Sequence, residues 1–165
     1  MKYDKSFLRI KTLSMREKKK LSGKKFNFKL IFNLIKKDFK KKKITIAGYY
    51  PANHEVNVVN FLQEASKKNF NIVLPVVKSS NKMIFKSWVF QEPLYVNKFG
   101  ILEPKKSKKE IIPDLIMVPL VAFDSKLNRI GYGKGYYDRS LNKIVKIKKK
   151  IVSLGIAYSF QRCAS

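Results

Sequence analysis

The spacing of apolar residues predicts two helices at the start of the chain. Residues 5–20 contain no glycine or proline and are rich in good helix formers, although their apolar stripe is weak. After Ser22 and Gly23 interrupt this pattern, apolar residues recur at helical spacing over 28–35. That spacing places them on one face of a second helix, which we expect to end in the lysine run at 40–43.

Residues 44–77 have the pattern of a strand, a helix and a second strand. The β-branched segment 44–49 predicts a short strand that stops before Pro51, because proline lacks an amide hydrogen and restricts its neighbour. Asn53 is the expected cap of a helix over 55–68, and the apolar run 72–77 predicts a buried strand. This order indicates a βαβ unit, whose two strands pair in parallel.

The second half of the chain adds further strands and one helix. A strand is expected at 83–90, whereas 92–109 mixes proline, glycine and lysine without a period and predicts a loop. The apolar segment 115–118 is the expected central strand, followed by a helix over about 135–144 and a last strand over 151–157. Alternating strands and helices indicate an α/β fold with a mostly parallel sheet.

The composition fits one folded domain spanning residues 1–165. Hydrophobic residues make up 45% of the chain, which is enough for a buried core. The single cysteine, Cys163, excludes an intramolecular disulfide and a cysteine-based zinc site, and it favours a reducing, cytoplasmic setting. We expect no membrane partner, because the most apolar segment, 111–123, is too short to span a bilayer and no secretory signal is present.

The charge of the chain is strongly positive. Lys and Arg number 37 against 11 Asp and Glu, which gives a formal net charge of +26. Such a field attracts anions, including nucleotides and nucleic acids. Almost all of the positive residues are lysines, however, whereas the recognition of bases favours the bidentate fork of arginine. We therefore expect a solvated lysine-rich surface and no dedicated nucleic-acid partner, with a basic nucleic-acid-binding protein as the alternative.

The segment 129–139, RIGYGKGYYDR, carries the clearest chemical signal. Its three alternating glycines let backbone amides approach an anion, and the helix expected to follow adds partial positive charge. Lys134 and Arg129 would neutralise phosphate groups, and Asp138 would hold Mg²⁺ together with nucleotide phosphates. On spacing alone, a glycine-rich turn with locally packed tyrosines stays open as the alternative, because this is not the P-loop pattern.

This segment and residues 113–124, PDLIMVPLVAFD, together resemble the signature of the 5-formyltetrahydrofolate cyclo-ligase family. Weaker family features lie upstream in the expected order: Lys5 and Arg9, Tyr50, Pro51 and Glu55, Leu74 and Pro75, and Phe85 with Trp88. The resemblance implies a three-layer α/β/α fold of the NagB/RpiA/CoA-transferase type. It also implies an ATP-dependent ligase of one-carbon folate metabolism, which closes 5-formyltetrahydrofolate to 5,10-methenyltetrahydrofolate and releases ADP and phosphate.

The resemblance further implies which residues bind each ligand. The expected ATP-binding residues are Lys5, Arg9, Arg129, Ile130, Gly131, Tyr132, Gly133, Lys134, Gly135, Tyr136 and Tyr137. The expected substrate-binding residues are Tyr50, Glu55, Tyr132, Gly133, Lys134, Gly135 and Tyr136. Lys134 and Arg129 are the expected catalytic residues, and Asp138 is the expected Mg²⁺ ligand.

Plainer roles stay open for several of these residues. Lys5 is a solvated lysine by default in so basic a chain, and Glu55 is alternatively a favourable negative charge where a helix begins. Phe85 and Trp88 either flank a pterin ring or pack in the core, which is the commoner fate of such residues. His54 is expected to be a loop residue with no catalytic partner.

The family comparison also bears on the C-terminal end. Family members usually continue past the last strand with a glutamate, a His-Asp pair and a final strand, whereas this chain ends at Ser165 soon after Gln161. Compared with the family, the chain is therefore expected to lack the usual C-terminal segment and a second metal ligand. We separately expect a monomer. We expect weakened or absent catalysis with nucleotide binding partly kept, and an inactive nucleotide-binding remnant stays open as an alternative.

Overall fold

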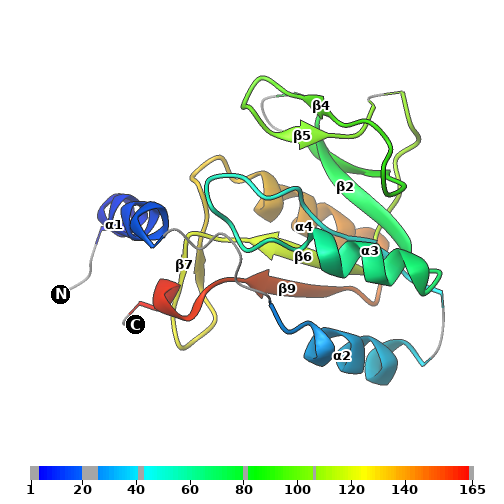
Figure 1. Cartoon of the computed structure of the whole chain (residues 1–165), viewed down its shortest axis with the longest axis horizontal. Helices are drawn as coiled ribbons and strands as arrows, with labels where there is room; N and C mark the ends of the chain where they lie inside the picture. The colour runs from blue at the N-terminus through cyan, green and yellow to red at the C-terminus, as the bar shows by residue number, and fades with distance from the viewer. Residues whose placement is uncertain (1–3, 20–25, 41–42, 80–81, 106, 164–165) are drawn as a thin grey trace.

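The computed structural model describes residues 4–19, 26–40, 43–79, 82–105 and 107–163 (Figure 1). Its helices are α1 Lys5–Lys18, α2 Lys29–Phe39, α3 Val59–Lys67 and α4 Tyr136–Ile147, with a 3-10 turn, η1, at Ser159–Gln161. Its strands are β1 Thr45–Ala47, β2 Asn71–Val77, β3 Met83–Ser87, β4 Tyr95–Val96, β5 Leu102–Glu103, β6 Leu115–Pro119, β7 Ala122–Phe123, β8 Arg129–Ile130 and β9 Val152–Ile156.

Five strands form the main sheet, in the order β3-β2-β1-β6-β9. β1 pairs in parallel with β2 and β6, and β6 pairs in parallel with β9, so that β3 alone of these five runs antiparallel to its neighbour. The expected βαβ unit is β1, α3 and β2. The segment expected to be the central strand, β6, is an interior strand beside the central β1, and all five of its residues are buried.

Helices cover both faces of this sheet, as Figure 1 shows. One apolar cluster packs α2 and α3 against one face, where Ile35 and Phe61 meet Ile46. The second cluster packs Ile144 of α4 against the opposite face, which includes Ala47. Neighbouring strand residues such as Ile46 and Ala47 serve opposite faces because side chains alternate along a strand. The expected three-layer α/β/α arrangement around a mostly parallel sheet is confirmed.

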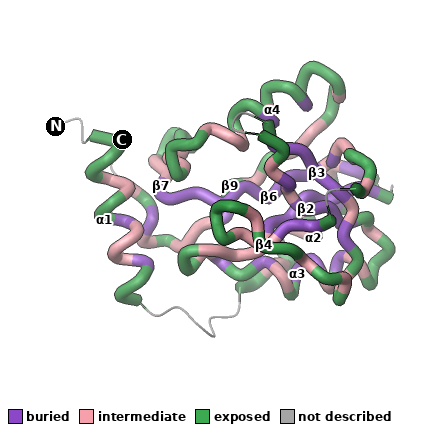
Figure 2. Tube along the Cα trace, turned by 90° about the horizontal axis from the view of Figure 1, so that it is seen from above, coloured by how far each residue is buried: buried purple, intermediate pink, exposed green. Residues whose placement is uncertain are grey.

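The first helix stands at one end of the molecule, beside β7, outside the buried sheet (Figures 1 and 2). Arg16 of α1 is 1% exposed and donates to the Leu120 carbonyl over 3.1 Å. The same carbonyl accepts a 2.8 Å hydrogen bond from the side chain of Gln161, which follows β9. Segments from the two ends of the described chain therefore hold the turn that leads from β6 into β7.

Two details of the sequence analysis are wrong. Helix α3 begins at Val59 and not at 55, with Val58 and not Asn53 as its cap. Asn53 and His54 have left-handed backbone angles, with φ of 48° and 57°, and form a turn well before the helix. The segment 92–109 is not only a loop, since β4 and β5 pair in an antiparallel hairpin within it. Phe85 and Trp88, at 2% and 6% exposure, pack in the core.

The turn of the hairpin depends on Asn97 and Gly100, whose significance was missed when residues 92–109 were predicted to be a loop. The Asn97 side-chain oxygen accepts hydrogen bonds from the amides of Phe99, over 2.8 Å, and Ile101, over 3.1 Å. Gly100 supplies a φ of +74°, which side chains disfavour. Within the part of the chain that the structure describes, no helix has the length and apolar character needed to cross a membrane.

Candidate functional site

A cavity of about 470 Å³ lies at the carboxyl ends of β1, β2 and β6. Tyr49 and Tyr50 reach it just after β1, Pro75 and Val77 at the end of β2, and Pro119 at the end of β6. In open α/β sheets, this is the edge at which ligands bind. The cavity is therefore the candidate site on grounds of topology alone.

All of the residues that the sequence analysis assigns to ATP, substrate or magnesium line this cavity. They are Lys5, Arg9, Tyr50, Glu55, Arg129, Ile130, Gly131, Tyr132, Gly133, Lys134, Gly135, Tyr136, Tyr137 and Asp138. They come from α1, from the loop after β1, and from the segment that joins β8 to α4. The fold brings these separate parts of the chain together, while the role of each residue stays a prediction.

The glycine-rich segment places backbone close to the cavity. Gly133 and Gly135 have φ angles of +93° and +65°, which glycine adopts without strain, and α4 begins directly after Gly135. Arg9 of α1 donates from Nε to the Gly131 carbonyl over 2.8 Å. Its guanidinium carbon would lie only 3.7 Å from a β-carbon added at Gly133. Backbone amides, the start of a helix and an arginine thus meet in one place, which is the composition of an anion site.

The remaining charged residues of the segment differ in their surroundings. Arg129 forms an ion pair with Asp138, whose side chain is 68% exposed in the first turn of α4. Lys134 is exposed, and its Nζ atom lies 5.9 Å from the centre of the Phe99 ring. Lys5 is also exposed at the start of α1.

A magnesium ion fits this donor set only together with a nucleotide. Among the residues that the structure describes, no group of three or more His, Cys, Asp or Glu could hold a metal ion. Asp138 offers one carboxylate, and a single carboxylate with phosphate oxygens and waters is a normal Mg²⁺ environment. The residues therefore suit a metal that arrives with phosphates, and not a metal bound by protein alone.

Glu55 lies in a hydrogen-bonded chain that reaches back to α1. One carboxyl oxygen of Glu55 accepts from the Tyr132 hydroxyl over 2.7 Å, and the other accepts from the Ala52 amide over 3.0 Å. Arg16 in turn donates to the Tyr132 hydroxyl oxygen over 2.8 Å and to the Asn53 carbonyl over 3.1 Å. Because α3 begins four residues after Glu55, the alternative of a charge at a helix start is wrong.

Burial shifts the pKa values of the titratable groups around Glu55. It raises the pKa of the Glu55 carboxyl group, although the hydrogen bonds from Ala52 and Tyr132 and the charge of Arg16 counteract part of the rise. Burial is also the main reason why the pKa values of Tyr49, Tyr132 and Tyr137 are raised. Two of these hydroxyl groups donate hydrogen bonds, Tyr49 to the Val56 carbonyl over 2.9 Å and Tyr132 to Glu55, whereas the buried Tyr137 hydroxyl has no partner among the described residues.

The sequence analysis missed Arg16 and the hairpin side of the cavity. Arg16 follows Arg9 by seven residues, which is two helical turns on the same face, so the spacing was a signal. Asn97, Phe99, Ile101 and Glu103 of the hairpin segment also line the cavity. Asn97 and Gly100, two turn-forming residues inside the predicted loop, could have indicated the turn of this hairpin.

Comparison with known proteins agrees with this geometry. The family model described as "5-formyltetrahydrofolate cyclo-ligase family" matches residues 2–165. A 5-formyltetrahydrofolate cyclo-ligase of Mycoplasma pneumoniae is 39% identical over 166 residues, which are 96% of this chain and 88% of that protein. The Haemophilus influenzae protein of that name is 35% identical over 123 residues, so that the match spans 71% of this chain and 65% of the relative.

Solved structures give the same answer. A 5,10-methenyltetrahydrofolate synthetase from Mycoplasma pneumoniae superimposes with a TM-score of 0.68 at 29% identity, covering 98% of this chain and 89% of that one. The synthetase from Aquifex aeolicus also gives 0.68, at 31% identity, covering 98% of this chain and 81% of that one. The chain therefore belongs to the 5-formyltetrahydrofolate cyclo-ligase family.

Proposed function

We propose that this protein closes 5-formyltetrahydrofolate to 5,10-methenyltetrahydrofolate at the expense of ATP, releasing ADP and phosphate. Membership of the family and the names of the relatives support this reaction. The observation that carries it is that the glycine-rich segment, the basic residues of α1 and Glu55 line one cavity. An anion site and a hydrogen-bonding site for an organic substrate thus adjoin, as the transfer of a phosphoryl group between two bound substrates requires.

The phosphate end of the cavity is the glycine-rich segment. Lys134, Arg129, Arg9 and Lys5 would neutralise the triphosphate, while backbone amides near the start of α4 donate to its oxygens. Asp138 would hold Mg²⁺, which neutralises phosphate charge when it is bound with the nucleotide. For Asp138 to do so, its ion pair with Arg129 has to open or be shared with a phosphate group.

The substrate end includes Tyr50, Glu55 and Tyr132. In the reaction, the formyl oxygen attacks the terminal phosphorus of ATP, the bond to the bridging oxygen breaks, and ADP leaves. The second nitrogen of the substrate then attacks the activated carbon, and phosphate departs with the former formyl oxygen and the nitrogen's proton. This route needs positioning and charge neutralisation, so no protein nucleophile and no covalent protein intermediate are expected.

The direct test follows methenyl absorbance in purified protein supplied with ATP, magnesium and 5-formyltetrahydrofolate. We expect absorbance to rise only when ATP and the folate are both present. Calorimetric binding of each ligand should be measured in parallel, because it separates an inactive nucleotide-binding remnant from a chain that binds neither. A chain that ignores both ligands and binds RNA with a steep salt dependence would refute the proposal and favour the nucleic-acid alternative.

We also propose that the chain acts as one cyclo-ligase domain, as a monomer, in the cytoplasm. The single cysteine of the sequence and its wide spread of lysines are consistent with this setting. Size-exclusion chromatography with light scattering tests the monomer, and a dimer at micromolar concentration would refute it.

A further inference from the structure

The hairpin of β4 and β5 forms an apolar wall on one side of the cavity. Phe99 and Ile101 line the cavity from the hairpin, and Val77 and Met83 line it from the ends of β2 and β3. The hairpin stands above the main sheet beside β2, which also contacts β5 (Figure 1). The Phe99 ring lies 6.1 Å from the ring of Tyr136, so the hairpin reaches across to the glycine-rich segment. Side chains of this kind suit a flat organic ring and not a phosphate.

One buried polar atom in this apolar wall has no partner. Glu103 is 2% exposed, and one of its carboxyl oxygens, Oε2, accepts hydrogen bonds from the Val77 amide over 3.0 Å and from Asn97 Nδ2 over 3.1 Å. The other oxygen, Oε1, is equally buried and has no hydrogen-bond partner among the described residues. Buried polar atoms are nearly always satisfied, so an unsatisfied oxygen in a cavity wall is the expected mark of a ligand contact.

The chemistry of this oxygen restricts the ligand. A carboxyl oxygen accepts hydrogen bonds, so it favours an N–H donor and disfavours phosphate oxygens. Together with the apolar wall, it suits a planar heteroaromatic ring with N–H groups on its edge. The proposed reaction brings two such rings to the cavity, the pteridine of the folate and the adenine of ATP.

Donor patterns distinguish the two rings. The 2-amino-4-oxo edge of a pteridine presents two adjacent N–H groups, which match the two free acceptor positions of an unpartnered oxygen. Adenine presents one amino group between ring nitrogens that are acceptors, and these would repel the carboxyl oxygen. We infer that Glu103 binds the N–H edge of the substrate's pteridine ring and seats that ring against the β4–β5 hairpin. This inference rests on the proposed function, whose substrate supplies the ring.

The substitution Glu103→Gln tests this contact because the surrounding donors fix its orientation. The Val77 amide and the Asn97 amide group both donate to the same oxygen, so the glutamine oxygen must occupy that position. Its NH₂ group then replaces the unpartnered acceptor, Oε1. We expect Kd for 5-formyltetrahydrofolate, measured by calorimetry, to rise at least about tenfold, while Kd for ATP changes less than about twofold.

Two controls keep the test specific. Glu110→Gln removes the same charge outside the cavity, where Glu110 is paired with Lys143 at 3.7 Å on the surface, and it should leave both Kd values unchanged. A 2-desamino analogue of 5-formyltetrahydrofolate should bind the parent chain at least about tenfold more weakly than the natural substrate. This second measurement needs no substitution, so it can overturn the inference even if Glu103→Gln does not fold.

The outcomes separate this inference from the proposed function. If the parent chain forms methenyl product but Glu103→Gln and the analogue bind as tightly as their references, the inference is wrong and the function stands. If Glu103→Gln lost affinity for ATP alone, Glu103 would be assigned to adenine, and the inference about the pteridine ring would also be wrong. A parent chain that does not bind 5-formyltetrahydrofolate overturns both.

Discussion

At the scale of the single residue, Glu55 links burial to a pH dependence. Its pKa is raised in the folded protein, chiefly by burial, above the value of about 4.3 expected in an unfolded chain. The folded state therefore binds more protons than the unfolded state across the interval between the two pKa values. Stability from this group is present below the unfolded pKa and is lost as the pH rises through the folded one.

Replacing Glu55 with Gln should remove this loss. We expect the difference in free energy of unfolding, variant minus parent, to increase as pH rises from about 4.3 and then to level off above the raised pKa. Urea denaturation of both proteins at a series of pH values measures it. A difference that stays constant across the series would contradict the assignment.

Tyr132→Phe provides the matched control. The hydroxyl group of Tyr132 donates to Glu55 over 2.7 Å and lowers its pKa, so its removal should raise that pKa further. In this background, the effect of Glu55→Gln should continue to grow to higher pH than in the parent. An unchanged pH interval would show that the hydrogen bond does not reach the carboxyl group in solution.

In the proposed phosphate site, Lys134 is the residue whose loss we expect to weaken nucleotide binding most. ATP with magnesium at about a hundred times Kd should stabilise the parent by about 2.7 kcal/mol. Lys134→Ala should abolish this gain while leaving the free protein within about 0.5 kcal/mol of the parent, because the side chain is exposed. Thermal denaturation with and without the nucleotide measures both. Lys149→Ala removes an exposed lysine that does not line the cavity and should keep the full gain.

At the scale of the element, Arg16 fastens the first helix to the site. Its guanidinium group donates to two carbonyl oxygens and to Tyr132, so Arg16→Met should remove three hydrogen bonds made by a buried cation. We expect a loss of about 1.5–3 kcal/mol of stability, as for hydrogen bonds that involve a charged group. The affinities for ATP and for 5-formyltetrahydrofolate should both fall, because α1 carries Lys5 and Arg9 while Tyr132 orients Glu55.

Urea denaturation and calorimetry test this expectation for α1. Lys11→Met, at an exposed position on the same helix, should change neither stability nor affinity. If Arg16→Met lost stability but bound both ligands normally, the residue would be purely structural.

The elements differ in how well the sequence predicts them, for a physical reason. Long periodic segments such as α2 and α4, and apolar runs such as β2 and β6, carry their own signal, because each buries a full face or a whole strand. The hairpin strands have two residues each, and nothing in so short a segment reports a period. The position of the hairpin is fixed instead by the turn at Asn97 and by the contact between β5 and β2.

The site divides in the same way. The glycine-rich segment is continuous in sequence, so its chemistry can be read from neighbouring letters. Arg16 and Glu103 act through partners far along the chain, such as Tyr132 and Val77, and only the fold shows those contacts. In so basic a chain, an arginine without its contacts is indistinguishable from a solvated charge.

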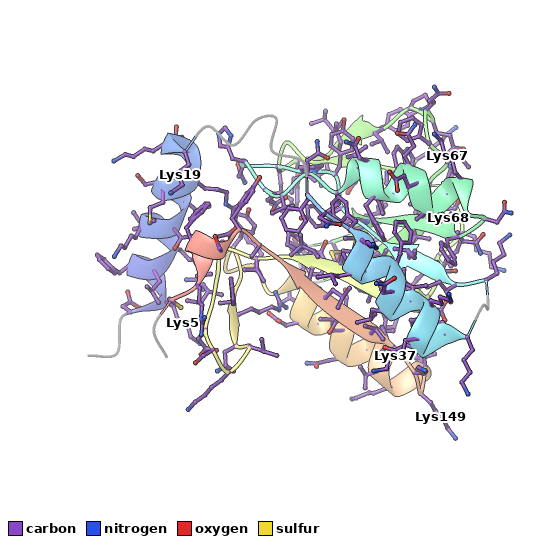
Figure 3. All side chains as sticks on the ribbon, turned by 60° about the horizontal axis from the view of Figure 1, so that its bottom comes forward. Lys5, Lys19, Lys37, Lys67, Lys68 and Lys149 are labelled. Atoms are coloured by element: carbon purple, nitrogen blue, oxygen red, sulfur yellow. The ribbon has the colours of Figure 1, made fainter. Side chains whose placement is uncertain are left out.

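At the scale of the whole molecule, the net charge of +26 is the dominant feature. Lysines extend outward from separate elements, including α1, α2 and α3, and do not gather on one face (Figure 3). Such a distribution raises the potential everywhere and destabilises the compact state through self-repulsion.

Salt should therefore act in opposite directions on folding and on binding. Raising NaCl from about 0.05 M to about 0.5 M should increase the melting temperature of the free protein, since screening weakens repulsion between its charges. The same change should weaken the affinity for ATP, whose triphosphate is attracted by that field. Thermal denaturation and calorimetry at matched salt concentrations measure the two trends. A melting temperature that falls with salt would contradict the first expectation, and an affinity for ATP that rises with salt would contradict the second.

The separateness of the β4–β5 hairpin has an evolutionary consequence. Its strands pair with each other and supply none of the five strands of the main sheet, yet its side chains line the cavity. Insertions or exchanges between positions 95 and 103 would leave the hydrophobic layers intact while reshaping the ligand's surroundings. Sequence differences that change substrate preference among homologues should accordingly concentrate in the β4–β5 hairpin. Replacing the hairpin of one homologue with that of another should transfer the substrate preference.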